Sequence, residues 1–141
     1  EHECKLDAKG RLVLPSRLKS VLPSASKNSI VVRKGFEPNL IIYPLSEFQN
    51  IYARINSLNE FSSEQRRLKR NLFSSISQVD LDSNARFLIP KSMISHCELE
   101  KEVILIGVGN IIELWNPVIY KKNLITNSEE FSKLAQKYLD V

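Results

Sequence analysis

The sequence contains few of the residues from which metal and redox sites are made. Of 141 residues, two are histidine and two are cysteine, and neither Cys4 nor Cys97 belongs to a CxxC pair. Zinc-binding and thiol-redox motifs depend on such spacing, so we expect neither kind of site. Both cysteines lie in apolar contexts, which favours buried, reduced thiols.

Long apolar runs are also missing. No stretch approaches the ~20 apolar residues that cross a bilayer, so we expect no membrane segment. No basic start followed by an apolar stretch indicates a secretory signal. We expect a cytoplasmic protein, because the two cysteines fit reduced thiols. Hydrophobic residues make up 43% of the chain and charged residues 26%, as is typical of a folded domain and not of a disordered chain.

What the sequence does contain is a phrase that occurs twice. LDAKGRLVLP at residues 6–15 is followed by LDSNARFLIP at residues 81–90, with Asp, Arg and Pro at the same spacing. The copies align at an offset of 75 residues here and at 72 further on, where Tyr43 matches Trp115. Each copy predicts the same series of strand, turn, strand, short helix, strand, turn, strand and long helix. We therefore interpret the chain as a tandem duplication.

Apolar runs and alternating patterns predict eight strands. The residues between them are turn formers such as glycine, asparagine and serine, which separate successive strands. The expected strands span residues 2–7, 11–14, 30–32, 40–43, 77–82, 86–89, 103–106 and 111–115.

The helices are predicted from caps and apolar stripes. A short helix should follow Pro15 and end near Pro23, and longer ones should start at two capping boxes, Ser46–Gln49 and Ser62–Gln65. Asn116-Pro117 is a further helix start. The last helix carries an apolar stripe that predicts a core or subunit contact, formed by Phe131, Leu134, Ala135, Tyr138 and Leu139.

A unit of four short strands buries little surface and leaves its edges open. Two copies can interleave so that each closes the edge of the other. We therefore predict a β-rich α+β fold in which two repeats form a pseudo-twofold, β-barrel-like unit with flanking helices. The expected boundaries are 1–46 for the first repeat, 47–75 for a helical connector, 76–118 for the second repeat and 119–141 for the C-terminal helix.

The repeated phrase also predicts how its turn is held. An aspartate precedes an arginine by four residues in both copies, Asp7–Arg11 and Asp82–Arg86, and a charge-assisted hydrogen bond between them would fix the loop. Gly10 can adopt a positive φ in the first turn. The second turn has Ala85 at that place, so we expect Asn84 to take the left-handed conformation there.

The sequence does not predict an enzyme. Asp7 and Asp82 in duplicated halves could suggest an aspartic-protease dyad, but the arginine near each lowers the carboxyl pKa and opposes the sharing of a proton. There is no Ser-His-Asp set, phosphate-binding glycine loop or metal cluster. We therefore expect no catalytic residue, no cofactor, no metal and no small-molecule substrate.

Positive charge is concentrated near the start of the chain. The net charge is +4 overall, but residues 1–35 hold eight Lys or Arg and three Asp or Glu, a net +5. Such a region favours an anionic partner, of which nucleic acid is the commonest. The second basic run, residues 66–70, is better interpreted as the solvated face of a helix, with Leu68 on its buried side.

The motifs together resemble the MraZ family of bacterial transcriptional regulators, part of the AbrB-like group of swapped-hairpin proteins. The resemblance rests on both repeated phrases, on the basic helix before the second, and on IIYPLSEFQNI and IIELWNPVIY. It implies two AbrB-like repeats per chain and a homo-oligomeric ring, usually an octamer. It also implies a nucleoid-associated repressor that binds repeated, G-rich promoter boxes of the division and cell-wall gene cluster.

The resemblance further implies that the motif arginines, Arg11 and Arg86, contact double-stranded DNA. An arginine fork can bind guanine O6 and N7 together in the major groove. Lys9, Lys5 and Arg17 are expected to neutralise phosphates, which sets position but not sequence. Because the second turn lacks both the glycine and the lysine of the first, we expect the first motif to dominate.

Two alternatives stay open at this point. An AbrB-like antitoxin would bind a toxin as well as DNA, but antitoxins usually have one such module and a disordered tail. A structural oligomer would use its basic turns for subunit contacts only. Steep salt dependence of DNA binding would separate the regulator from the structural oligomer.

Overall fold

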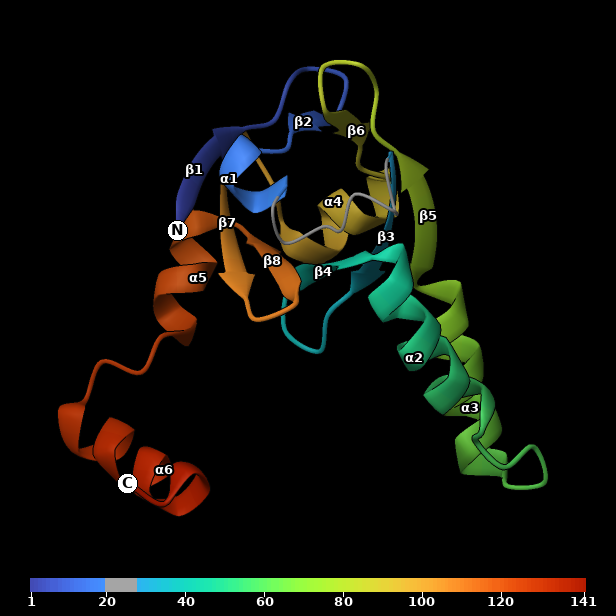
Figure 1. Cartoon of the computed structure of the whole chain (residues 1–141), viewed down its shortest axis with the longest axis vertical. Helices are drawn as coiled ribbons and strands as arrows, with labels where there is room; N and C mark the ends of the chain where they lie inside the picture. The colour runs from blue at the N-terminus through green and yellow to red at the C-terminus, as the bar shows by residue number, and fades with distance from the viewer. Residues whose placement is uncertain (20–27) are drawn as a thin grey trace.

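The computed structural model describes residues 1–19 and 28–141 as a mixed α+β protein rich in strands (Figure 1). The helix predicted from Pro15 to about Pro23 is described only in its first part; the rest lies outside the described residues. The first repeat contributes β1 (His2–Lys5), β2 (Arg11–Val13), α1 (Ser16–Lys19), β3 (Ser29–Lys34), β4 (Asn39–Pro44), α2 (Leu45–Asn56) and α3 (Ser63–Ser74). The second contributes β5 (Ile76–Asp80), β6 (Arg86–Leu88), α4 (Lys91–Cys97), β7 (Glu102–Val108), β8 (Ile111–Trp115), α5 (Pro117–Asn123) and α6 (Ser128–Leu139).

The two repeats interleave through their first strands. Six strands form one antiparallel sheet in the order β1-β7-β8-β4-β3-β5, so β1 pairs with β7 of the second repeat and β5 pairs with β3 of the first. This confirms the predicted exchange of strands between the repeats. The sheet of the described strands is open, with β1 and β5 at its edges, so the barrel-like closure is not confirmed.

The strand register reveals a pseudo-twofold axis. β2 and β6 form a separate two-stranded ribbon in which Leu12 lies opposite Phe87, its own equivalent at the 75-residue offset. In the large sheet, Ile41 lies opposite Glu113, its equivalent at the 72-residue offset. A residue that faces its own equivalent marks a point on the axis. The axis therefore runs through the ribbon and the middle of the sheet.

Alternating side chains bury both faces of the large sheet. On one face, Ile30 and Val32 belong to the main core, which also contains Leu12 and Phe87 of the ribbon. On the other face, Val31 belongs to a smaller cluster with side chains of α2. Leu12 and Phe87 are 1% and 2% exposed, and their packing in the main core holds the inner face of the ribbon against the large sheet. The other face of the ribbon points outward.

The helix starts follow the sequence in two places and depart from it in one. The Ser62 side chain accepts from the Gln65 N–H, and the Asn116 side chain accepts from the Val118 N–H, which confirms both N-caps. The return bond of the box predicted at Ser62–Gln65 is not formed, because Gln65 Oε1 accepts from the Asn59 N–H instead. The capping box predicted at Ser46–Gln49 is wrong. Strand β4 runs directly into α2 through Pro44, whose φ of −63° suits a helix start, so the helix begins one residue before Ser46 and has no side-chain cap.

The apolar stripe of α6 is not part of the core of this chain. Its large side chains are 37–72% exposed, and Figure 1 shows the helix set apart from the sheet. Leu68 of α3 was predicted to lie on the buried side of its helix, but it is 47% exposed. Both helices therefore present apolar surface that residues 1–19 and 28–141 do not cover.

No helix among the described residues is long and apolar enough to span a membrane. Within the same residues, no three His, Cys, Asp or Glu side chains are grouped so that they could hold a metal ion. Of the two free cysteines, Cys97 is buried and Cys4 half-buried.

Candidate nucleic-acid interface

The first Asp-x-x-x-Arg turn is closed by one carboxylate. Asp7 Oδ1 accepts from the backbone N–H groups of Lys9 (2.9 Å) and Arg11 (2.8 Å), while Asp7 Oδ2 accepts from Arg11 Nε (2.9 Å). Gly10 adopts a φ of +82°, as the turn requires of it. One oxygen therefore holds the backbone of the turn, and the other holds the arginine side chain.

The second turn repeats this geometry atom for atom. Asp82 Oδ1 accepts from the N–H groups of Asn84 and Arg86, both at 2.9 Å, and Oδ2 accepts from Arg86 Nε at 2.8 Å. The left-handed residue is Ala85, with a φ of +60°, and the assignment to Asn84 is wrong. The Asn84 N–H donates to Asp82 Oδ1, and the Ala85 N–H donates to the Asp82 carbonyl. These two bonds fix the turn so that Ala85 is the residue with the left-handed conformation. A left-handed alanine costs roughly 1–2 kcal/mol.

These hydrogen bonds keep both aspartates ionised. The Arg11 N–H is the main cause that lowers the pKa of Asp7 below its ordinary value, followed by the Arg11 side chain. The Arg86 N–H has the same effect on the pKa of Asp82. Each carboxylate thus remains a charged anchor for its arginine, whose side chain is about one-third exposed.

The ribbon brings the two arginines onto one outward face. In its register Arg11 lies opposite Leu88, and Val13 lies opposite Arg86, so all four side chains share a face. Each guanidinium is anchored through Nε alone, and its terminal nitrogens have no hydrogen-bond partner among the described residues. Those terminal N–H groups are the ones that could donate to a ligand.

Two members of this face, Val13 and Leu88, were not recognised in the sequence. They are 52% and 56% exposed, although they occupy a strand that reads as apolar. A signal was present, because arginine and apolar residues alternate with the buried Leu12 and Phe87 in both copies. Recognising it requires knowing that β2 and β6 pair with each other.

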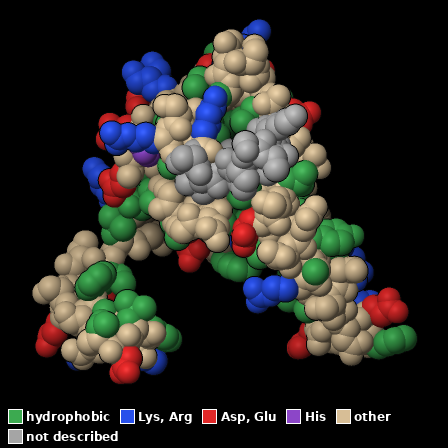
Figure 2. Space-filling view, in the orientation of Figure 1, with side chains coloured by type: hydrophobic (Ala, Val, Ile, Leu, Met, Phe, Trp, Pro, Cys, Tyr) green, Lys and Arg blue, Asp and Glu red, His purple; other side chains and the backbone are tan. Residues whose placement is uncertain are grey.

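The other predicted contact residues lie around the ribbon. Lys9 is exposed within the first turn. Lys5 is exposed on β1, opposite Glu102 of β7, and Arg17 is exposed on α1. The two turns project side by side at one end of the molecule, away from α3 and α6 (Figure 1), and Lys and Arg side chains occur around this end in Figure 2.

Fold and site together define a protein of two swapped-hairpin repeats with paired arginine turns at the tip. The family described as "MraZ protein, putative antitoxin-like" matches residues 1–71 and again residues 72–141. The chain therefore belongs to the MraZ family.

Relatives called transcriptional regulator MraZ match between 79% and 99% of this chain. The one from Cytophaga hutchinsonii is 48% identical over 99% of this chain and 92% of its own length. That from Christiangramia forsetii is 34% identical over 98% of this chain and 90% of its own length. That from Pseudomonas syringae pv. syringae is 40% identical over 79% of this chain and 74% of its own length.

Proposed function

We propose that this chain is a sequence-specific DNA-binding transcriptional regulator that inserts the β2–β6 ribbon into the major groove. The observation that carries the proposal is the outward pair Arg11 and Arg86, each held by an aspartate through Nε, with terminal N–H groups that no described residue binds. The major groove admits a two-stranded ribbon, and arginine is the commonest reader of guanine there. The transcriptional-regulator names of the relatives support the same function.

Each part of the tip has a separate role in this proposal. The guanidinium forks of Arg11 and Arg86 donate to guanine O6 and N7. Val13 and Leu88 lie between them and fit thymine methyl groups or exclude water. Lys9, and further out Lys5 and Arg17, neutralise phosphates and set the position of the ribbon.

The natural target in this proposal is a set of repeated, G-rich boxes in the promoter of the division and cell-wall gene cluster, where the protein acts as a repressor in the nucleoid. One ribbon offers two arginines, and such a small contact gives weak specific binding by itself. A homo-oligomeric ring that presents several ribbons to spaced boxes raises the affinity through effective concentration. Family membership and the small size of the tip support this part of the proposal.

The test begins with selection of bound fragments from the source genome, which identifies the operator directly. Replacing Arg11 with Ala should then weaken binding to that operator by roughly 5- to 150-fold, the value of one bidentate base contact. Fluorescence anisotropy with a labelled duplex measures the change. Arg67→Ala, which removes an exposed charge on α3 far from the ribbon, serves as the charge-matched control.

The salt dependence of binding is the second readout. Affinity should fall steeply as salt rises, and the slope of log K against log salt should decrease by about one for Arg11→Ala. Equal binding by Arg11→Ala and the native protein would contradict the proposed site. A flat salt dependence would favour a structural oligomer instead of a regulator.

A further inference from the structure

The apolar stripe of α6 has no partner within the described part of the chain, and the repeat shows a reason. In the first repeat, α3 packs beside α2, a helix of 12 residues. The counterpart of α2 in the second repeat is α5, which has only seven residues. Phe131 and Tyr138 of α6 are therefore left 61% and 72% exposed, with Leu134 between them. Contiguous apolar surface of this kind marks a protein contact.

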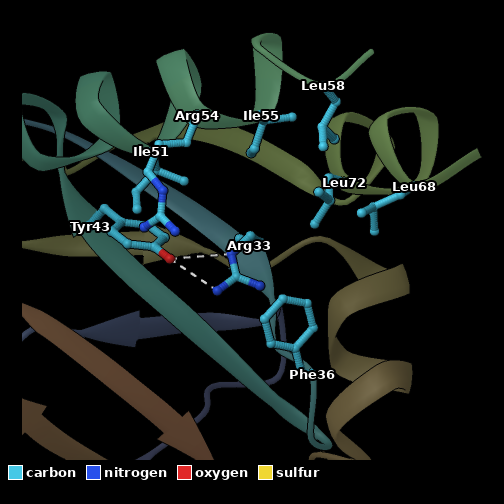
Figure 3. A pocket seen from close by; sticks show the side chains of 9 residues that line it. All are labelled: Arg33, Phe36, Tyr43, Ile51, Arg54, Ile55, Leu58, Leu68 and Leu72. Atoms are coloured by element: carbon cyan, nitrogen blue, oxygen red, sulfur yellow. Dashed lines mark hydrogen bonds between the residues drawn. The ribbon is translucent and has the colours of Figure 1, made fainter. Parts of the chain in front are cut away.

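A matching hollow lies on the α2–α3 hairpin of the same chain. It has a volume of about 280 Å³ and opens between the hairpin and strand β3 (Figure 3). Phe36, at the rim, is 83% exposed. The apolar lining from α2, α3 and the residues after α2 repeats at helical spacing, through Ile51, Ile55, Leu58, Leu68 and Leu72. Such rows accept the side chains of a third helix.

The charges of the two surfaces are complementary. Of the nine described residues that line the hollow, two are the arginines Arg33 and Arg54, and none is acidic. Arg33 is held in place, because its Nη2 donates to the Tyr43 hydroxyl at 3.0 Å. The first turn of α6, by contrast, carries Glu129 and Glu130. Arg33 is buried at 8% exposed, whereas Arg54 is exposed at the edge of the hollow. An acidic start followed by an apolar stripe suits an apolar hollow with these two arginines in its lining.

We propose that α6 of one copy docks into the α2–α3 hollow of a second copy, with Phe131, Leu134 and Tyr138 as the anchors. Docking within one chain is disfavoured, because α6 and the hairpin lie on opposite sides of the body (Figure 1). The linker from α5 to α6 is residues 124–127, which span at most about 14 Å.

The two surfaces differ, so the contact is head-to-tail, and each chain offers one of each surface. Repeated contacts of this kind close into a ring when the rotation allows. Both surfaces lie at the end opposite the Asp-x-x-x-Arg turns, which leaves every ribbon of the assembly exposed. This contact is the subunit interface of the ring, and in that respect it rests on the proposed function.

The first experiment measures self-association of the full chain by light scattering after size exclusion. Phe131→Glu should shift the protein to monomer and weaken association at least tenfold, while circular dichroism stays native because α6 is exposed. Phe61→Glu is the matched control: Phe61 is 87% exposed, lies before α3 and does not line the hollow. Phe131→Glu with the native assembly size would overturn the proposal.

The second experiment tests the direction of the contact by disulfide trapping. One batch carries Leu134→Cys and another Leu68→Cys, and the native chain with its two native cysteines is the background control. A covalent dimer should form only when the two batches are mixed and oxidised. A dimer from Leu134→Cys alone, or no dimer from the mixture, would overturn the head-to-tail contact.

DNA binding separates the failure of this contact from the failure of the proposed function. On a duplex with a single box, Phe131→Glu should bind as the native protein does, and on repeated boxes it should lose the gain in affinity. Equal gains on repeated boxes for both proteins would contradict the inferred contact. Absence of operator binding by the native protein would contradict the proposed function and leave the trapping result to decide the contact.

Discussion

The two oxygens of Asp7 have separable tasks, and Asp7→Asn distinguishes them. Oδ1 accepts both backbone hydrogen bonds of the turn, and Oδ2 accepts only from Arg11 Nε. An asparagine keeps an oxygen at the first position and places an NH₂ group at the second, where it cannot accept. The turn should therefore persist while the arginine loses its anchor.

The magnitude follows from the freedom that Arg11 regains. Holding an arginine side chain in one rotamer costs roughly 1–2 kcal/mol, which corresponds to about 5- to 30-fold in a dissociation constant. In the native protein Asp7 already holds the Arg11 side chain in one rotamer before DNA binds. Asp7→Asn should weaken operator binding by this factor and change the melting temperature little, because an exposed ion pair contributes little stability.

The assay is anisotropy titration of the operator duplex, run beside thermal unfolding. Asp80→Asn is the matched control, since it makes the same charge change on an exposed residue of β5. Asp80 accepts a hydrogen bond from the Ser29 hydroxyl, whereas Asp7 accepts from Arg11. Its affinity should equal the native value. If Asp7→Asn bound the operator as tightly as the native protein or more tightly, the aspartate would not orient Arg11 for DNA, and the reasoning would be refuted.

Three further predictions concern the body of the protein. Gly10→Ala should lower the free energy of unfolding by about 1–2 kcal/mol in urea titration, because φ there is +82°; an unchanged midpoint would contradict the turn geometry. Burial raises the pKa of Cys97 to about 12, so a thiol reagent at pH 8 should label Cys97 only after unfolding, and labelling of the native protein at the unfolded rate would count against it. The lowered pKa of Asp7 and of Asp82 means that their stabilisation is complete above the ordinary value of 3.8 and is lost as the pH falls through the folded-state pKa. The small melting difference summed over both turns, between the native protein and Asp7→Asn/Asp82→Asn, should accordingly shrink only in acid, and a difference that shrinks near neutral pH would refute this sign.

The duplication made much of the fold predictable. Once LDAKGRLVLP and LDSNARFLIP are recognised as equivalent, the open edges of the short strands predict that the two repeats exchange strands. The pairing of β1 with β7 and of β5 with β3 confirms this prediction. The Asp-to-Arg hydrogen bonds follow from the spacing alone, because the interaction is local. What could be predicted is thus either repeated or close in sequence.

The features that were missed depend on neighbours distant in sequence. Ser46 has the signature of a cap, but the path of β4 through Pro44 starts the helix earlier. Asn tolerates the left-handed region better than Ala, yet the hydrogen bonds of the turn assign that place by position and not by propensity. The stripe of α6 predicts a core or subunit contact, and only the structure shows that its side chains stay exposed in this chain.

The exchanged edge strands also constrain how the protein can be made. His2 in β1 pairs opposite Leu105, more than a hundred residues away in sequence. During translation the first strand must wait until most of the chain has left the ribosome, and β3 stays unpaired on one edge until β5 follows. Long-range pairing of this kind folds slowly and exposes strand edges meanwhile. A chain truncated after the first repeat should consequently be insoluble or chaperone-bound instead of forming half of the protein.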